Sequence, residues 1–247
     1  MAAFDFKKEY RDLYTPKGTP MLVDVPAMTF IAVAGSGDPN EEGGAYAEAM
    51  ALLYGLSFTI KMSKMGSWQP PGYFDYVVPP LEGLWWGGCG AFDGTRIADK
   101  AALSWVSLIR QPDFVAPEVF VWACDAVARK KPELADALAA GRARLVRFAE
   151  GPCVQVMHRG PYDDEPATIA QLDDFIADRG LVTDIALGEG PGGAEGVLLD
   201  GPSILDALDV GEAISTIRLH HEIYLGDPRR TKPENLRTVI RHPVRPA

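Results

Sequence analysis

Short apolar runs alternate along this chain with longer stretches in which apolar side chains recur every three or four positions. The runs at 28–34 and 103–110 are rich in β-branched and aromatic residues, which is typical of strands. The stretch between them carries one apolar stripe at helical spacing. Its members are Ala45, Ala49, Leu52, Leu53 and Leu56. The pattern predicts a strand–helix–strand–strand unit over 28–110.

The second half of the chain repeats this order. Residues 153–158 read as a strand and 162–181 as a helix, and 215–225 is the last strong strand candidate. The helix places four apolar side chains on one face. These are Ile169, Leu172, Phe175 and Ile176. The matching order predicts an internal duplication.

These patterns predict one α+β domain over 1–247, built from two βαββ modules. The modules span 28–110 and 145–228, and a helical connector at 111–144 joins them. In such units helices bury one face of the sheet, which leaves room for a cleft between the two halves.

Three segments lie outside this pattern. Prolines keep residues 1–27 extended in part, so we expect an arm there. Residues 187–212, rich in glycine and acidic residues, are expected to form an inserted surface loop, with a short helix near Ile204–Leu208. Beyond the last strand we expect a short helix near Pro233 and a proline-rich coil whose arginines are solvated. Those arginines are Arg229, Arg230, Arg237, Arg241 and Arg245.

Charge and cysteine content narrow the function classes. The formal net charge of −10 repels nucleic-acid phosphates, and no basic stripe offsets it, so neither DNA nor RNA is an expected partner. Three cysteines without a CxxC pair indicate a reducing compartment, and we expect a cytoplasmic protein. No apolar run reaches the roughly 20 residues that span a bilayer, so no membrane partner is expected.

The strand 215–225 carries the most informative polar residue. Because side chains alternate along a strand, His220, Glu222 and Tyr224 share one face. Ile223 lies on the other face, which we expect to be the helix-packed side. His221 also falls on that side, and the pattern accounts for it only at the rim of the sheet.

Glu222 has two interpretations. In one, the strand lies at an edge and its polar face meets water. In the other, Glu222 sits on the floor of a pocket, where it awaits a cation or activates a water molecule. Burial then moves its acidity toward the range that suits a general base.

A dense aromatic segment offers walls for such a pocket. Within 68–86 lie Trp68, Tyr73, Phe74, Tyr76, Trp85 and Trp86. Core packing is the ordinary role of aromatic side chains, yet Tyr and Trp also combine an apolar plane with one polar group. Neighbouring Trp85 and Trp86 must face opposite sides of a strand. Trp105 and Tyr162 are further wall candidates, and Glu82 is either a turn residue or a second carboxylate at the mouth.

Other catalytic patterns are weak. His220 and Glu222 could converge on a metal, but no third ligand is evident, so no metal and no cofactor is expected. The glycine-rich stretches at 35–37 and 188–193 lack the P-loop lysine and the Rossmann spacing. Cys153 lies on a predicted strand and reads as a core residue.

Five long segments resemble the standalone GyrI-like small-molecule-binding proteins. They are FDFKKEYRDLY at 4–14, GYFDYVVPPLEGLWW at 72–86, IRQPDF at 109–114, GPYDDEPATI at 160–169 and HHEIYLGDPRRTKPENL at 220–236. The resemblance covers nearly the whole chain except residues 187–212, where this chain carries an extra loop.

The resemblance implies a pseudo-twofold pair of βαββ modules with a ligand cleft between the sheets. Relatives bind apolar or cationic aromatic small molecules around a buried glutamate, which matches Glu222. Some members hydrolyse cyclopropane-bearing DNA-alkylating compounds with a glutamate and a tyrosine. Tyr76 is our candidate for that tyrosine, and Tyr162 and Tyr224 stay open.

Three functions therefore remain in order. The first is a detoxifying hydrolase that opens an electrophilic ring with water, using Glu222 and Tyr76. The ligand-binding residues are then Tyr73, Phe74, Glu82, Trp85, Trp86, Trp105, Tyr162, His220 and Tyr224. The second is a drug-binding or sensor protein without catalysis. The third is a transcription co-regulator, for which residues 1–27 are too short to form a helix-turn-helix.

Overall fold

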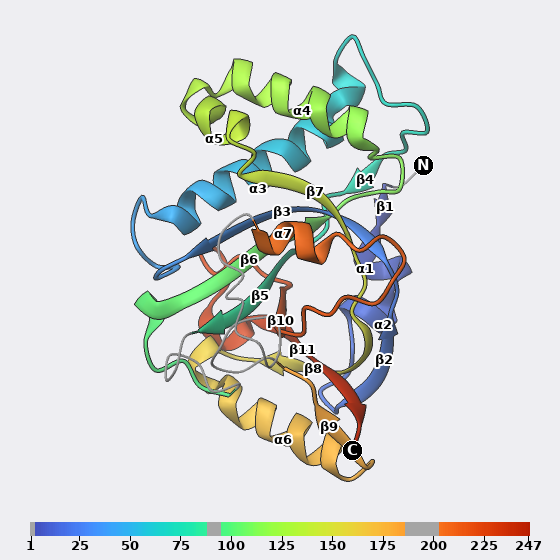
Figure 1. Cartoon of the computed structure of the whole chain (residues 1–247), viewed down its shortest axis with the longest axis vertical. Helices are drawn as coiled ribbons and strands as arrows, with labels where there is room; N and C mark the ends of the chain where they lie inside the picture. The colour runs from blue at the N-terminus through green and yellow to red at the C-terminus, as the bar shows by residue number, and fades with distance from the viewer. Residues whose placement is uncertain (1–2, 88–94, 186–202) are drawn as a thin grey trace.

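The protein is built around one large antiparallel β-sheet with helices on both of its faces (Figure 1). The computed structural model describes residues 3–87, 95–185 and 203–247. The sheet runs in the order β2-β8-β11-β10-β5-β6-β3-β7, and β9 pairs with β11. Its strands are β2 (Met21–Val25), β3 (Met28–Ser36), β5 (Leu81–Gly87), β6 (Leu103–Arg110), β7 (Ala143–Phe148), β8 (Gly151–Arg159), β9 (Leu181–Thr183), β10 (His220–Tyr224) and β11 (Arg237–Pro246).

Two βαββ units form this sheet and meet at its centre. The first is β3, α3 (Ala45–Lys61), β5 and β6, and the second is β8, α6 (Glu165–Ala177), β10 and β11. Outward from the central pair, the order is β5-β6-β3 on one side and β10-β11-β8 on the other. The two halves therefore have the same internal order, which confirms the predicted α+β fold with paired βαββ units.

The predicted coil at the C-terminus is wrong. Residues 237–246 form β11, which pairs with β8, β9 and β10, and Arg241 is only 1% exposed. Pro243 lies past the stretch that pairs with β10, so its missing N–H does not interrupt that ladder. The preceding strand is also shorter than predicted, since β10 begins at His220. Near Pro233 the chain forms only a 3₁₀ turn, Pro233–Asn235.

Both long helices of the units cover the same face of the sheet, and it is the face that carries Glu222. Leu52 of α3 packs in one cluster with Trp85, and Leu172 of α6 packs in another with Ile240. Ile240 lies opposite Glu222 in the β10–β11 ladder, so these side chains point the same way. The expectation that the Ile223 face is the one packed by these helices is therefore wrong.

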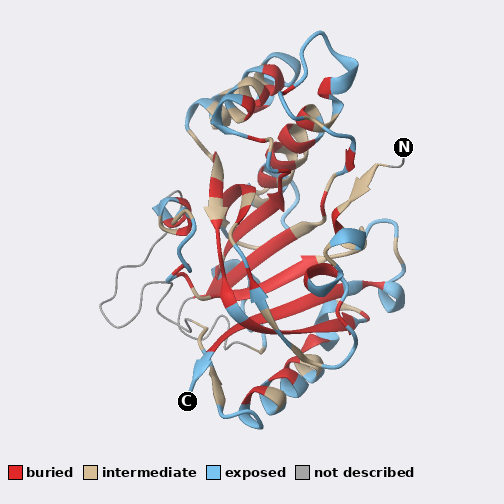
Figure 2. Ribbon diagram, turned by 90° about the vertical axis from the view of Figure 1, so that its right-hand side faces the viewer, coloured by how far each residue is buried: buried red, intermediate tan, exposed pale blue. Residues whose placement is uncertain are grey.

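The opposite face has its own cover. There Ile223 packs in a cluster with Phe6 and Leu13 of the N-terminal arm and with Ile204 and Leu205. The arm is more ordered than predicted: β1 (Phe4–Asp5) pairs with β4 (Tyr76–Val77), and the short helices α1 (Phe6–Glu9) and α2 (Arg11–Tyr14) follow. With a core on each side, most strand residues are buried (Figure 2).

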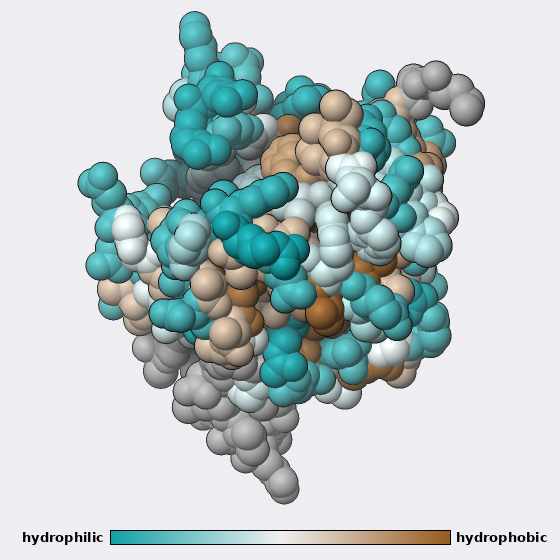
Figure 3. All heavy atoms as spheres, turned by 90° about the horizontal axis from the view of Figure 1, so that it is seen from above, coloured by the Kyte–Doolittle hydropathy of each residue, from teal (hydrophilic) through white to brown (hydrophobic). Residues whose placement is uncertain are grey.

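The remaining helices lie around this framework. In the connector, α4 (Pro117–Lys130) packs on α3, and the short α5 (Ala135–Ala139) packs on α4. The short helix predicted within the inserted loop is confirmed as α7 (Ser203–Leu208), while 187–202 fall outside the described residues. Seen from above, the surface is largely hydrophilic with scattered apolar side chains (Figure 3). In the described part of the chain, no helix has the length and apolar character needed to cross a membrane.

Candidate ligand cleft

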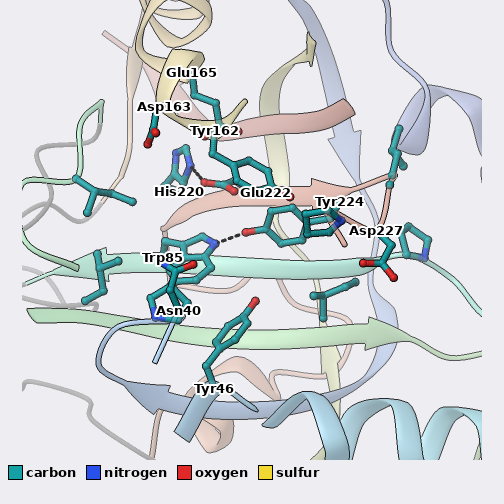
Figure 4. A pocket seen from close by; sticks show the side chains of 18 of the residues that line it. Asn40, Tyr46, Trp85, Tyr162, Asp163, Glu165, His220, Glu222, Tyr224 and Asp227 are labelled. Atoms are coloured by element: carbon teal, nitrogen blue, oxygen red, sulfur yellow. Dashed lines mark hydrogen bonds and ion pairs between the residues drawn. The ribbon is translucent and has the colours of Figure 1, made fainter. Parts of the chain in front are cut away.

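A cleft opens where the two βαββ units meet, on the face that carries α3 and α6. Its volume is about 960 Å³, a size that holds a drug-like molecule. Strands β5 and β10 form the floor, α3 forms one wall and the start of α6 the other (Figure 4). Among the described residues, the aromatic and acidic lining consists of Tyr46, Tyr54, Trp85, Tyr162, Asp163, Glu165, Glu222, Tyr224 and Asp227.

Glu222 lies on the floor because of its register in the sheet. It is on central strand β10, paired with Gly83 on one side and Ile240 on the other. Glu222 is 7% exposed, so its carboxylate is largely removed from bulk water. This excludes the interpretation that Glu222 belongs to a solvated edge strand. A buried carboxylate requires partners, and the neighbouring side chains provide them.

Two histidines stand in a row behind Glu222. His220 Nε2 lies 2.9 Å from Glu222 Oε1, and His220 Nδ1 lies 2.8 Å from His242 Nε2. All three residues are buried. Burial, followed by the neighbouring His220, lowers the pKa of His242 well below its ordinary value, so the His242 ring is neutral. Sequence reasoning missed His242, because only the pairing of β10 with β11 brings it to His220.

A tryptophan and a tyrosine fix each other beside Glu222. Trp85 Nε1 donates to the Tyr224 hydroxyl over 2.8 Å, as the dashed line in Figure 4 shows. Gly83, between them on the strand surface, leaves room for this pair. A Cβ at Gly83 would lie 2.6 Å from Trp85 Nε1 and 3.2 Å from the Tyr224 hydroxyl.

Tyrosines complete the walls. Tyr46 of α3 stacks on Trp85 with the ring centroids 5.9 Å apart, and Tyr162 meets Tyr224 edge to face at 5.8 Å. Burial, then the charge of Glu222, raises the pKa of Tyr162 to about 12 and that of Tyr224 well above its ordinary value. These phenols therefore keep their protons at neutral pH and can donate hydrogen bonds.

A second carboxyl group lies at the start of α6. Glu165 is 7% exposed, and one of its oxygens has no hydrogen-bond partner among the described residues. Burial, then the negative charge of Glu222, raises the pKa of Glu165 well above its ordinary value. Glu165 is thus neutral at pH 7, and its carboxyl proton is a possible donor inside the cleft. Sequence reasoning missed Glu165, because its position next to Glu222 depends on where α6 packs.

Five of the predicted site residues line this cleft. They are Trp85, Tyr162, His220, Glu222 and Tyr224. Two predicted tryptophans lie elsewhere: Trp86 is on the opposite face with the N-terminal arm, and Trp105 is fully buried beneath α3. Trp105 lies against Gly35 of the adjacent strand, where a Cβ would come within 2.4 Å of its ring. We correct both assignments from pocket wall to core.

The aromatic segment before β5 serves another purpose. Tyr73 and Phe74 surround Phe114, and Phe74 also meets Phe4 of the N-terminal arm with centroids 5.4 Å apart. Tyr76 packs edge to face on Phe6 at 6.4 Å. These three predicted residues hold the arm against the sheet and do not line the cleft. The structure therefore does not bring Tyr76 to Glu222, and we do not retain it as the catalytic tyrosine.

Glu82 and His221 belong to a buried polar cluster on the face opposite the cleft. His221 Nε2 lies 3.1 Å from Glu82 Oε2, and its Nδ1 lies 2.9 Å from Glu150 Oε2. Arg241 Nη1 donates to Glu150 over 2.9 Å, and Tyr14 donates to Glu82 over 3.1 Å. Two carboxylates thus face two cations. Glu82 is not at the pocket mouth, His221 is not at the rim and Arg241 is not solvated, because β5, β10 and β11 bring them together inside.

No group of three or more His, Cys, Asp or Glu side chains within 3–87, 95–185 and 203–247 is arranged to hold a metal ion. The chemistry of the cleft therefore rests on carboxyl, phenol, indole and imidazole groups in the part of the chain described.

Fold and cleft together define an α+β protein with a single small-molecule-sized site described between its two βαββ units. No protein-family model and no curated protein matches the sequence. Solved structures do. An uncharacterized conserved protein from Listeria innocua is 42% identical, with a TM-score of 0.77, over 98% of this chain and 100% of its own. Two proteins described as hydrolases from Listeria innocua are each 40% identical, with TM-scores of 0.75 and 0.77, over 98% and 99% of this chain and 100% of their own. The chain belongs to the family of these Listeria proteins.

Proposed function

We propose that the protein binds an apolar aromatic small molecule in the cleft and hydrolyses a strained, electrophilic ring of the cyclopropane type. The observation that carries the proposal is the buried Glu222 carboxylate on a floor walled by aromatic rings, with one oxygen held by His220. The description of two 40% identical relatives as hydrolases and the resemblance to GyrI-like proteins support it.

In this reaction Glu222 acts as general base toward one water molecule. Glu222 takes a proton from the water, the water oxygen bonds to a ring carbon, and one C–C bond of the ring breaks. The electron pair of that bond moves into the conjugated acceptor group of the substrate, which then takes up a proton. Glu222 releases its proton to solvent, so the overall change is the addition of one water. A site that excludes bulk water favours this step, because a desolvated carboxylate is a stronger base.

The neighbouring groups have separate roles in the proposal. Trp85 and Tyr46, which stack on each other, offer flat apolar surfaces to the substrate. Tyr224, fixed by Trp85, replaces Tyr76 as the tyrosine that orients the water. The neutral Glu165 can donate a hydrogen bond to an acceptor oxygen on the substrate.

The test is incubation of the purified protein with a cyclopropane-bearing alkylator, followed by mass spectrometry of the small molecule. We expect a gain of one water per molecule with the wild type and no gain with Glu222→Gln, which keeps the side-chain shape but removes the base. Glu133→Gln, at an exposed position, is the matched control and should turn over like the wild type.

Two other outcomes would contradict the catalytic proposal. An unchanged compound that quenches the tryptophan fluorescence indicates the alternative function, a drug-binding protein without catalysis. Turnover that survives in Glu222→Gln removes Glu222 as the base.

A further inference from the structure

His242 occupies an unusual position relative to the cleft. It lies on β11, and like His220 it points to the face that carries Glu222, since Ile240 two residues earlier is paired with Glu222. His220 and Glu222 line the cleft, whereas His242 is 1% exposed and lies behind His220. It therefore reaches a ligand only through His220.

The hydrogen bond between the two imidazole rings needs one proton. Of His220 Nδ1 and His242 Nε2, 2.8 Å apart, one nitrogen must donate and the other accept. The remaining nitrogen of His242, Nδ1, is buried and has no partner among the described residues. A proton on Nδ1 leaves a buried donor unpaired, and orphaned buried N–H groups are rarer than under-satisfied acceptors. The proton of His242 therefore lies on Nε2.

This assignment determines the state of His220. If His242 Nε2 donates, His220 Nδ1 accepts and carries no proton. His220 then holds its proton on Nε2, 2.9 Å from Glu222 Oε1, and donates it to the carboxylate. In the other tautomer a bare nitrogen would face the carboxylate, which favours a protonated Glu222 that cannot act as a base.

We propose that His242 is a positioning residue: it fixes the tautomer of His220, and through it keeps Glu222 ionised and oriented on the cleft floor. The inference rests on the proposed function, because it assigns His242 a part in making Glu222 a base. Outer partners that orient a functional side chain typically change activity about 10–100-fold when they are removed.

The first test reads protonation directly and does not depend on turnover. Nitrogen-15 NMR of histidine-labelled wild-type protein at pH 7.5 should show His220 and His242 neutral, each with its proton on Nε2. The chain has four histidines, so single substitutions can assign the signals. A His220 signal from an imidazolium, or from a ring protonated at Nδ1, would overturn the proposal.

The second test compares two variants with the cyclopropane-bearing alkylator as substrate. His242→Gln keeps an N–H donor near the same place and should stay within about 3-fold of the wild-type kcat. His242→Met fills a similar volume without a donor, and its kcat should fall about 10–100-fold while KM stays within about 2-fold. Equal kcat values for the Gln and Met variants, or a loss confined to KM, would contradict the proposal.

The two tests also separate this inference from the proposed function. If Glu222→Gln still turns over, the proposed function fails, whereas the wild-type tautomers can be as predicted. If Glu222 is the base and His220 is found in the other tautomer, only the role of His242 fails. Should His242→Met not fold, the wild-type spectrum together with His242→Gln still decides.

Discussion

Glu222 and Glu165 share the cleft with a single negative charge between them. Both are largely buried, and each makes ionisation of the other more costly. Because Glu165 responds by keeping its proton, one carboxyl group can accept a proton while the other can donate. This division follows from burial and proximity alone, and it matches the acid and base assignments found in many hydrolytic sites.

Substitution of two tyrosines tests the reassignment of the catalytic tyrosine. Tyr224→Phe removes the acceptor of Trp85 Nε1, so it should lower turnover of the alkylator about 10-fold or more and weaken ligand binding. Tyr76→Phe removes a buried hydroxyl that has no partner among the described residues, so turnover should be unchanged. Steady-state kinetics of the two variants, with thermal melts to confirm folding, provide the comparison. A loss in Tyr76→Phe alone would return the role to Tyr76.

At the scale of elements, the site depends on the pairing of β5 with β10. This ladder joins the two units, and it sets Trp85 opposite His220 and Gly83 opposite Glu222. Gly83 is needed because the Trp85 ring lies across its Cα toward Tyr224. A side chain at this one position would displace the ring that fixes the tyrosine.

Gly83→Ala should therefore impair the cleft while leaving the sheet folded. The added Cβ would lie 2.6 Å from Trp85 Nε1, and relief of such overpacking typically costs about 1–3 kcal/mol of unfolding free energy. We expect at least 10-fold weaker binding of the alkylator, measured by tryptophan fluorescence. Gly55→Ala in α3 is the control, since its Cβ meets nothing closer than 3.6 Å and alanine favours helix. Equal binding by both variants would show that Gly83 does not shape the site.

At the scale of the whole molecule, the two faces of the sheet have different tasks. The face under α3 and α6 holds the cleft, while the opposite face buries the charged cluster around His221 that ties the N-terminal arm to the sheet. Burial opposes the charge on His221, but Glu150 and Glu82 overcome it and raise the pKa of His221 to about 9. Burial likewise disfavours the charge on Glu150, but His221 and Arg241 lower its pKa to about 2.

This cluster predicts how stability changes with pH. The pKa of His221 is about 9 in the folded protein and 6.5 ordinarily, so the folded state binds the extra proton. Its contribution to the unfolding free energy is complete below pH 6.5 and is lost as the pH rises through 9. Urea unfolding of the wild type should therefore show a fall in unfolding free energy between pH 6.5 and 9. In His221→Gln, which cannot titrate, the fall should be smaller. Parallel pH profiles of the two proteins would show that His221 is not charged in the fold.

Local pattern determined much of this protein. Periodicity places the apolar faces of α3 and α6 and the main strands, because side chains repeat every 3.6 residues on a helix and every two on a strand. Alternation around Glu222 also puts His220, Glu222 and Tyr224 on one face and separates Trp85 from Trp86. The paired βαββ units follow from the repeated order of elements, and the coil predicted at β11 fails because prolines and arginines hide its apolar positions.

Only the tertiary structure decided which face is the cleft and which residues complete it. His242 and Glu165 reach Glu222 through strand pairing and helix packing, contacts that no spacing along the chain encodes. The same long-range pairing moves Glu82 and His221 into an internal charge cluster. It also leaves Tyr73, Phe74 and Tyr76 against the N-terminal arm. Sequence thus fixes the direction in which a side chain points within its own element, whereas the partner it meets depends on contacts between elements far apart in the chain.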